Sequence, residues 1–385
     1  MRRASGFSLV ELMVAIVLAL VVMAGAIAVF VGSRTAYQST AGVAAVTDGG
    51  RIAVALLQQD VRNSGYIACT QTEYYWQTMD AQDTRVMLDA LNGAAGTLAY
   101  DFRYGIAGYE ATGTAPNDAV MVAAAPVVDE TNADWTPALD TAFTDGSIAP
   151  APTQTAGSDV LVLRSSLGVT PAYLTQYVPT GTTNFTVSDV AKLAVGQIAA
   201  LSDCRQAVVF QIGSAPAGGV GAVNVSLTTG GGVVPGDVAG ATVVRPFEAG
   251  SLVTPLTTTV YYIGKGADGD YALKRLALNA PGAAAPALFT DEEVVPDIES
   301  MQVLYGVATA SSLSPSQYVT ADNVPDFRQV VSVEIALLAA SAPGSGTGPP
   351  VPQSFNLLGT TVQLANDNRQ RRVFQFTVAI RNQMP

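Results

Sequence analysis

The chain has 385 residues, of which 49% are hydrophobic and 13% are charged. It carries 19 Lys and Arg against 31 Asp and Glu, and the formal net charge of −12 argues against a nucleic-acid partner because it repels phosphate backbones. It has no histidine, which removes the commonest general base and the commonest metal ligand. We therefore expect no catalytic residues, no metal site and no cofactor. The 36 Gly and 21 Pro predict many strands and loops.

The N-terminal region contains an uncharged apolar segment of 20 residues, Leu12 to Val31. A helix of this length spans roughly 30 Å, the thickness of the hydrocarbon core of a bilayer. A secretory signal has a shorter apolar region followed by a small-residue cleavage site, whereas here Ala24-Gly25-Ala26 lies inside the apolar run. Arg2 and Arg3 precede the segment, so the positive-inside rule predicts a cytoplasmic N-terminus. The residues beyond about 34 are then extracytoplasmic.

Glu11 is a carboxylate at the head of this apolar segment. A carboxylate in lipid costs about 2.5 to 3.5 kcal/mol at mid-helix and less near an interface, so one interpretation is a side chain that reaches the headgroups. The other interpretation depends on the stretch GFSLVELMVA, which starts at Gly6. It resembles the type IV prepilin signature, in which a short basic leader ends in Gly, Phe becomes the new N-terminus, and Glu stands at the fifth mature position.

The prepilin resemblance gives roles to three residues. It implies that a prepilin peptidase cleaves between Gly6 and Phe7, that residues 1–6 are removed, and that the new amine of Phe7 is N-methylated. This amine is a cation near pH 7, since α-amino groups titrate around 8. The Glu11 carboxylate can then pair with the Phe7 amine of a neighbouring subunit. At 4 Å and an effective dielectric constant near 20, such a pair is worth about 4 kcal/mol before desolvation.

The apolar part of the predicted helix covers residues 7–31. The pattern of residues 32–63 predicts that the helix continues there as an amphipathic segment. Gly49-Gly50 interrupts this part, and because each Gly costs about 1 kcal/mol in a helix, a bend or a melted turn is expected there. The apolar residues of this part form a stripe that should lie on a globular head: Val43, Val46, Ile52, Leu56 and Val61.

Residues 64–385 read as short strands and turns, which predicts an α+β fold: a long helix packed on a β-rich head of antiparallel strands. Asp268-Gly269 predicts a hairpin turn. Apolar residues alternate with others over 331–337 and 374–380, as in half-buried strands, and 341–354 reads as a surface loop between them. The head is expected to consist of two lobes that divide near residues 240–256.

Several segments also resemble the PilW minor pilins, over most of the chain except roughly residues 70–155 and 213–250. An acidic residue often follows the YGV turn in that family, whereas Ala308 and Thr309 stand here. The resemblance implies a non-catalytic subunit whose partners are other minor pilins, the major pilin, the prepilin peptidase, the inner membrane and a tip adhesin. The segments that carry it are QDVRNSGYIAC (59–69), VGQIAALSDCRQAVVFQI (195–212), VYYIGK (260–265), ESMQVLYGV (299–307), QYVTADNV (317–324) and RRVFQFTVAIRN (371–382).

The two cysteines are Cys69, just after the helix, and Cys204, in a predicted hairpin turn. A Cys204 nucleophile would lack a histidine to activate it. In an extracytoplasmic chain, a small even number of cysteines favours a disulfide, so we expect Cys69 to pair with Cys204. The acidic stretches Asp268-Gly269-Asp270 and 291–293 suggest calcium, but the ligand spacing of an EF-hand is absent and a turn or a solvated face explains both.

The sequence therefore predicts a minor pilin of a type IV pilus. It would be held in the inner membrane of a Gram-negative bacterium with a periplasmic head, and then carried to the cell surface in the fibre. The resemblance implies that it primes pilus assembly at or near the fibre tip and supports twitching motility and adhesion. Two alternatives are a minor pseudopilin of a type II secretion system, which shares the helix and the cleavage site, and a tip adhesin whose head binds a surface ligand directly.

Overall fold

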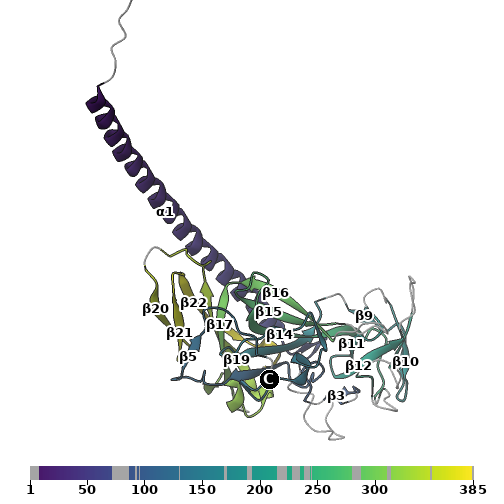
Figure 1. Ribbon diagram of the computed structural model, residues 1–385. Helices are drawn as coiled ribbons and strands as arrows, with labels where there is room; N and C mark the ends of the chain where they lie inside the picture. Colours follow the sequence, from purple (N-terminus) through teal and green to yellow (C-terminus); the bar gives the residue numbers. More distant parts are fainter. Residues whose placement is uncertain are drawn as a thin grey trace, which may run out of the picture.

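A computed structural model describes the chain as one long helix that projects from a β-rich head (Figure 1). This is the predicted α+β architecture, and the strand pairs are mostly antiparallel. The structure describes residues 8–71, 86–91, 93–94, 96–129, 131–168, 171–188, 193–214, 223–227, 235–237, 243, 245–279, 288–309, 314–346 and 349–383.

Helix α1 (Leu9–Asn63) is 55 residues long, and only its C-terminal half contacts the head. The predicted break at Gly49-Gly50 is wrong, since α1 continues through both residues. The predicted stripe is partly wrong, because Val43 and Ile52 are each 53% exposed. Small residues allow the helix backbone to approach the head closely, so they replace larger apolar residues in the contact. The buried residues of α1 are Gly42, Val46, Gly50, Ala53, Leu57 and Val61.

A 13-stranded sheet forms most of the head, and strand β14 (Leu252–Lys265) connects its parts. The start of β14 pairs with β11 and β9, and its end pairs with β15 and β8. The other strands of this central sheet are β3 (Val86–Asp89), β4 (Ile106–Ala111), β6 (Trp135–Thr136), β7 (Ile148–Ala149), β8 (Val160–Ser166), β9 (Ala172–Tyr173), β10 (Asn184–Val187), β11 (Ile198–Ser202), β12 (Gln206–Ser214), β13 (Val223–Leu227), β15 (Tyr271–Leu278) and β16 (Phe289–Pro296).

Three smaller sheets and four short 3-10 helices complete the head. The four-stranded sheet, in the order β18-β17-β19-β22, lies next to α1, and a three-stranded sheet has the order β20-β21-β5 (Figure 1). Their bounds are β17 (Ile298–Val307), β18 (Gln317–Val319), β19 (Val330–Ala340), β22 (Arg371–Ala379), β20 (Val351–Leu357), β21 (Thr360–Asp367) and β5 (Ala119–Val122). The remaining elements are β1 (Tyr66–Ile67), β2 (Thr70–Gln71), η1 (Thr141–Phe143), η2 (Ala321–Asn323), η3 (Phe327–Gln329) and η4 (Arg381–Gln383).

The strand predictions for the C-terminal part were confirmed in two places and wrong in two. The Asp268-Gly269 turn joins β14 to β15, and the alternating pattern of 374–380 lies in the half-buried β22. The other alternating segment lies in β19, an inner strand of its sheet, and residues on both of its faces, such as Ile335 and Ala336, are buried in the core cluster shared with α1. The predicted loop 341–354 is too long, since β20 begins at Val351.

The central sheet has hydrophobic core on both faces. Leu161 and Leu163 of β8 belong to the cluster shared with α1 and the four-stranded sheet, whereas Val160 and Val162 face a second cluster on the other side. A third cluster surrounds Phe210 and the start of β14. The continuous strand β14 contributes residues to all three clusters. The division into two lobes near 240–256 stays a prediction.

Candidate functional site

The N-terminal part of α1 has no contact with the head and exposes its apolar side chains. Leu9, Leu18 and Phe30 are 74%, 60% and 68% exposed. The most apolar window of α1 has a mean hydropathy of 3.1, and none of it is buried in the head. By length and composition, this helix could cross a membrane. An apolar surface of this size must be covered by lipid or by other protein.

Ser8 and Glu11 form a capping box at the start of α1. The backbone N–H of Ser8 donates to Glu11 Oε2 at 3.1 Å, and the N–H of Val10 donates to Ser8 Oγ at 3.3 Å. The Glu11 carboxylate therefore folds back toward the backbone of Ser8. Gly6 and Phe7, the predicted cleavage and methylation residues, lie outside the described residues. Sequence reasoning missed Ser8, although Ser followed three residues later by Glu before an apolar run is a capping signal.

Two glycines let α1 lie directly on the C-terminal part of the head. A Cβ atom placed on Gly50 would be 2.1 Å from Cε2 of Phe374 on β22, and one placed on Gly42 would be 2.9 Å from Cβ of Ser345. Gly49 points elsewhere, since its nearest neighbour would be Val295 Cγ1 at an ordinary 3.6 Å. Gly50 therefore serves packing rather than flexibility.

Polar contacts fix both ends of the part of α1 that lies on the head, which we call its contact region. Near its start, Gln370 Nε2 donates to Ser39 Oγ at 2.8 Å. Near the end of α1, the hydroxyl of Tyr261 donates to Asp60 Oδ2 at 2.6 Å. The amide of Asn382 donates to the carbonyl of Ser64 at 3.1 Å, so the last described residues of the chain hold the end of the helix. The head thus sets the direction in which the exposed part of α1 projects.

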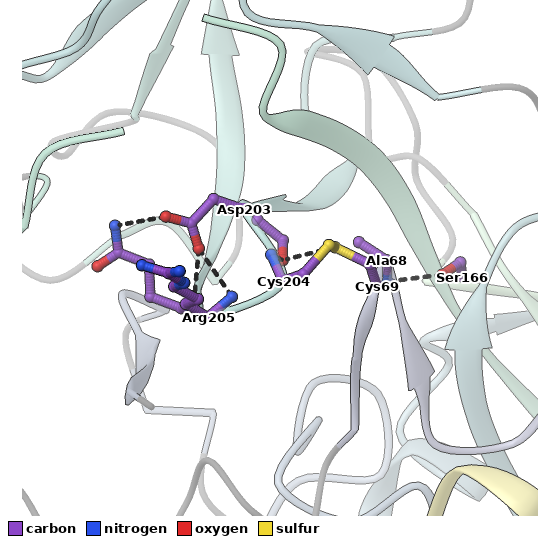
Figure 2. The surroundings of a disulfide bond; sticks show 8 residues. Ala68, Cys69, Ser166, Asp203, Cys204 and Arg205 are labelled. Atoms are coloured by element: carbon purple, nitrogen blue, oxygen red, sulfur yellow. Dashed lines mark hydrogen bonds between the residues drawn. A yellow bond between two sulfur atoms is a disulfide. The ribbon is translucent and has the colours of Figure 1, made fainter. Parts of the chain in front are cut away.

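A disulfide joins Cys69 to Cys204, as predicted (Figure 2). Cys69 follows β1, directly after α1, and Cys204 lies in the turn between β11 and β12, where its φ is +69°. Figure 2 shows the neighbouring contacts: the N–H of Ala68 donates to Ser166 Oγ at 3.2 Å, and the N–H of Arg205 donates to Asp203 Oδ1 at 2.9 Å. The bond thereby ties the end of α1 to the far part of the central sheet.

Replacing both cysteines, C69S together with C204S, should lower the free energy of unfolding by about 2 to 4 kcal/mol. The bond closes a loop with a sequence separation of 135 residues, which restricts the unfolded chain. Denaturant titration of the full chain in detergent measures the loss. Reductant should lower the stability of the wild-type protein to that of the double variant and leave the double variant unchanged. Quantitative alkylation of both wild-type cysteines without reductant would contradict the bond.

A buried ion network lies beneath the contact region of α1. Arg371 donates through Nε and Nη2 to Glu299 and through Nη1 and Nη2 to Asp367, at 2.5 to 2.9 Å. Arg369 pairs with Asp297 and lies 3.5 Å from Asp270. The bonds from Arg371 hold the pKa of Asp367 below its ordinary value. Burial raises the pKa of Asp297, although Arg369 opposes this.

The acidic stretches that suggested calcium are engaged with protein groups. Asp291 accepts from Lys274 Nζ at 2.5 Å and from the hydroxyl of Tyr262 at 2.7 Å. Glu292 pairs with Arg275 at 2.6 Å. In the part of the chain that the structure describes, no group of three or more acidic, histidine or cysteine side chains could hold a metal ion.

The sequence comparisons point to pilins. Residues 1–27 match the Prokaryotic N-terminal methylation motif, and residues 260–382 match the family described as Type IV Pilus-assembly protein W (PilW). The second match contains β19 and β22, which contact α1, and both arginines of the ion network. A search of curated proteins found no match.

The solved structures give two weak likenesses. A type IV-like pilin from Thermus thermophilus is 22% identical over 34% of this chain and 67% of its own, with a TM-score of 0.21. The phage phi92 endosialidase is 10% identical over 58% of this chain and 45% of its own, with a TM-score of 0.15. Both TM-scores are low, and neither likeness bears on the function. The two sequence matches, one at the exposed helix and one at the sheet that holds it, show that this chain is similar to proteins with an N-terminal methylation motif and, over residues 260–382, to the Type IV Pilus-assembly protein W family.

Proposed function

We propose that this chain is a structural subunit that helps prime pilus assembly and sits at or near the tip of a type IV pilus. The observation that carries the proposal is the division of α1: residues 12–31 are apolar and exposed, whereas the C-terminal half is fixed to the head. Such a helix is stored in a membrane before assembly and buried among other subunits afterwards. The role is assembly, not catalysis, and it supports twitching motility and adhesion.

The proposed processing follows the sequence signature. Prepilin peptidase cleaves between Gly6 and Phe7, removing residues 1–6, and the Phe7 amine is methylated. Residues 7–31 anchor the subunit in the inner membrane of a Gram-negative bacterium and later enter the filament core. Residues 32–63 connect the anchor to the periplasmic head, residues 64–385. The partners are other minor pilins, the major pilin and a tip adhesin.

The proposed position is just below the outermost subunit. Glu11 has a partner in the fibre only if another subunit stands ahead of it and offers its N-terminal amine. The capping box supports this role, because it holds the carboxylate at the start of α1, next to where a neighbour's amine would arrive. A subunit at the extreme tip has no such neighbour and no use for the charge.

Glu11→Ala should leave cleavage intact and reduce assembly. The scissile bond lies before Phe7, so the peptidase site is unchanged, while loss of the ion pair weakens the contact by up to a few kcal/mol after desolvation. We expect processed subunit to accumulate in the membrane and fewer fibres to form, as counted in sheared fractions and by electron microscopy. Glu334→Ala removes a carboxylate on the head and is the control.

Normal pilus numbers and normal incorporation of the Glu11→Ala subunit would refute the assembly role of this carboxylate. Co-purification with the full chain distinguishes a minor pilin from a pseudopilin, since a pseudopilin would bring down secretion-system subunits in place of minor pilins. Direct binding of the purified protein to a surface glycan would favour the adhesin role.

A further inference from the structure

Two acidic side chains are buried side by side between the central sheet and β17. Glu110 on β4 is 5% exposed, and Asp159, directly before β8, is 2% exposed. The hydroxyl of Thr114 donates to the carbonyl of Ala111 at 2.7 Å and lies between the two carboxyl groups, 3.2 Å from Glu110 Oε1 and 3.4 Å from Asp159 Oδ1. Neither residue takes part in the proposed assembly function.

Asp159 connects the two sheets. Its Oδ1 accepts from the N–H of Ala111 on β4 at 2.9 Å, and its Oδ2 accepts from the N–H of Val303 on β17 at 2.8 Å. Its own N–H donates to the carbonyl of Met301 at 2.9 Å. Both carboxyl oxygens are acceptors in these bonds, as expected of an ionised group. Through these bonds the Asp159 side chain links β4 to β17.

No cation compensates the pair among the residues that the structure describes. None of the ion pairs there includes Glu110 or Asp159. The other ionisable groups that act on the pair are Asp322 on η2, which is also negative, and the phenol of Tyr305 on β17. Two adjacent buried negative charges are strongly unfavourable, so one carboxyl group takes up a proton.

The space around the pair favours a proton over a larger ligand. The hollow lined by Glu110, Thr114, Asp159, Gln302 and Thr360 has no room for a water molecule. Glu110 Oε2 is buried and has no hydrogen-bond partner, which suits a neutral carboxyl group better than a carboxylate. Burial, reinforced by the charge of Asp159, raises the pKa of Glu110 to about 9, and burial also raises the pKa of Asp159.

We propose that Glu110 and Asp159 share one proton at neutral pH and act as a pH-sensitive lock between the central sheet and β17. With Glu110 neutral, Asp159 keeps its bonds to Ala111 and Val303. As the pH rises, the proton leaves and the two negative charges repel each other across the junction. The head therefore becomes less stable and opens between β4 and β17 as its surroundings become alkaline.

The direction in which stability changes with pH follows from the linkage between proton binding and folding. A carboxyl group whose pKa is raised by folding binds more protons in the folded state than in the unfolded state at any pH between the two values. Raising the pH through this interval therefore favours unfolding. For Glu110 the interval runs from an ordinary pKa of 4.5 to about 9.

Thermal unfolding of the full chain in detergent micelles between pH 5 and 9.5 tests the lock. Glu110→Gln imitates the protonated group, so its stability relative to the wild-type protein should rise with pH, by up to about tenfold in the unfolding equilibrium constant per pH unit. Glu334→Gln, on a half-buried carboxylate of β19, is the matched control, and the pH dependence of Glu110→Gln should exceed the pH dependence of this variant. A pH-independent difference for Glu110→Gln would overturn the proposal.

Amide hydrogen exchange on the wild-type protein is a second test of the lock, and it needs no variant. After correction for the intrinsic exchange rate, protection of the Val303 and Ala111 amides should fall as the pH rises. The Ile380 amide, which donates to the carbonyl of Val331 in the same part of the head, should keep its protection. Equal pH dependence at all three amides would show that no local lock exists.

Discussion

Gly50→Val should detach α1 from the head, with a loss of about 3 kcal/mol in the free energy of unfolding. A Cβ at this position would lie 2.1 Å from the Phe374 ring, and the two methyl groups of Val would add further overlap. Overpacking of a close contact costs about 1 to 3 kcal/mol, and this overlap is severe enough for the upper end. Calorimetry or denaturant titration of the full chain in detergent measures the loss.

Gly49→Ala is the matched control. Its Cβ would meet only Val295 Cγ1, at 3.6 Å, and Ala is the better helix former by about 1 kcal/mol. It should therefore be neutral or stabilising. Combining Gly50→Val with Phe374→Ala should recover part of the loss, because the obstructing ring is gone. If Gly50→Val and Gly49→Ala had equal effects, the close approach of α1 to β22 would be wrong.

Arg371→Ala should lower the free energy of unfolding by about 3 to 5 kcal/mol. The Arg371 side chain is 2% exposed and its partner Glu299 4%, so the substitution leaves a buried carboxylate without its cation. Asp367 also loses the bonds that lower its pKa. The stabilisation from Asp367 is complete above its unfolded-state pKa and is lost as the pH falls through the folded-state value. The variant should therefore show less acid dependence than the wild-type protein.

Arg372→Ala, one residue further, is the control. The Arg372 guanidinium lies 5.3 Å from the centre of the Phe374 ring and has an exposed side chain, so its loss should cost no more than about 1 kcal/mol. Arg371→Lys keeps the charge but cannot make both bidentate pairs, and it should fall between the two. Equal unfolding free energies for Arg371→Ala and Arg372→Ala would contradict the buried network.

The features that could be predicted from the sequence depend either on a local residue pattern or on the cellular compartment of the head. The apolar run and Glu11 locate the exposed part of α1, Asp268-Gly269 sets the β14–β15 hairpin, and the extracytoplasmic location favours the disulfide. These inferences need only neighbouring residues or the chain as a whole. None of these three inferences requires knowledge of contacts between residues that are distant in the sequence.

Two wrong predictions and one feature that the sequence did not indicate depend on contacts between distant parts of the chain. Gly50 reads as a helix breaker until Phe374, far along the sequence, is known to lie against it. Strand β19 alternates like a half-buried strand, but core side chains from other parts of the chain cover both of its faces. The acids Glu110 and Asp159 lie on separate segments, and nothing in either segment indicates that they meet.

The most direct test of the pilin assignment is mass spectrometry of the N-terminal peptide of this subunit from sheared, purified pili. We expect the subunit to be present in this fraction and its chain to begin at Phe7 with a methylated amine. Gly6→Leu should abolish both results and leave the full-length chain in the membrane. A subunit that enters the fibre with residues 1–6 still attached, or a Gly6→Leu variant that is cleaved normally, would contradict the account.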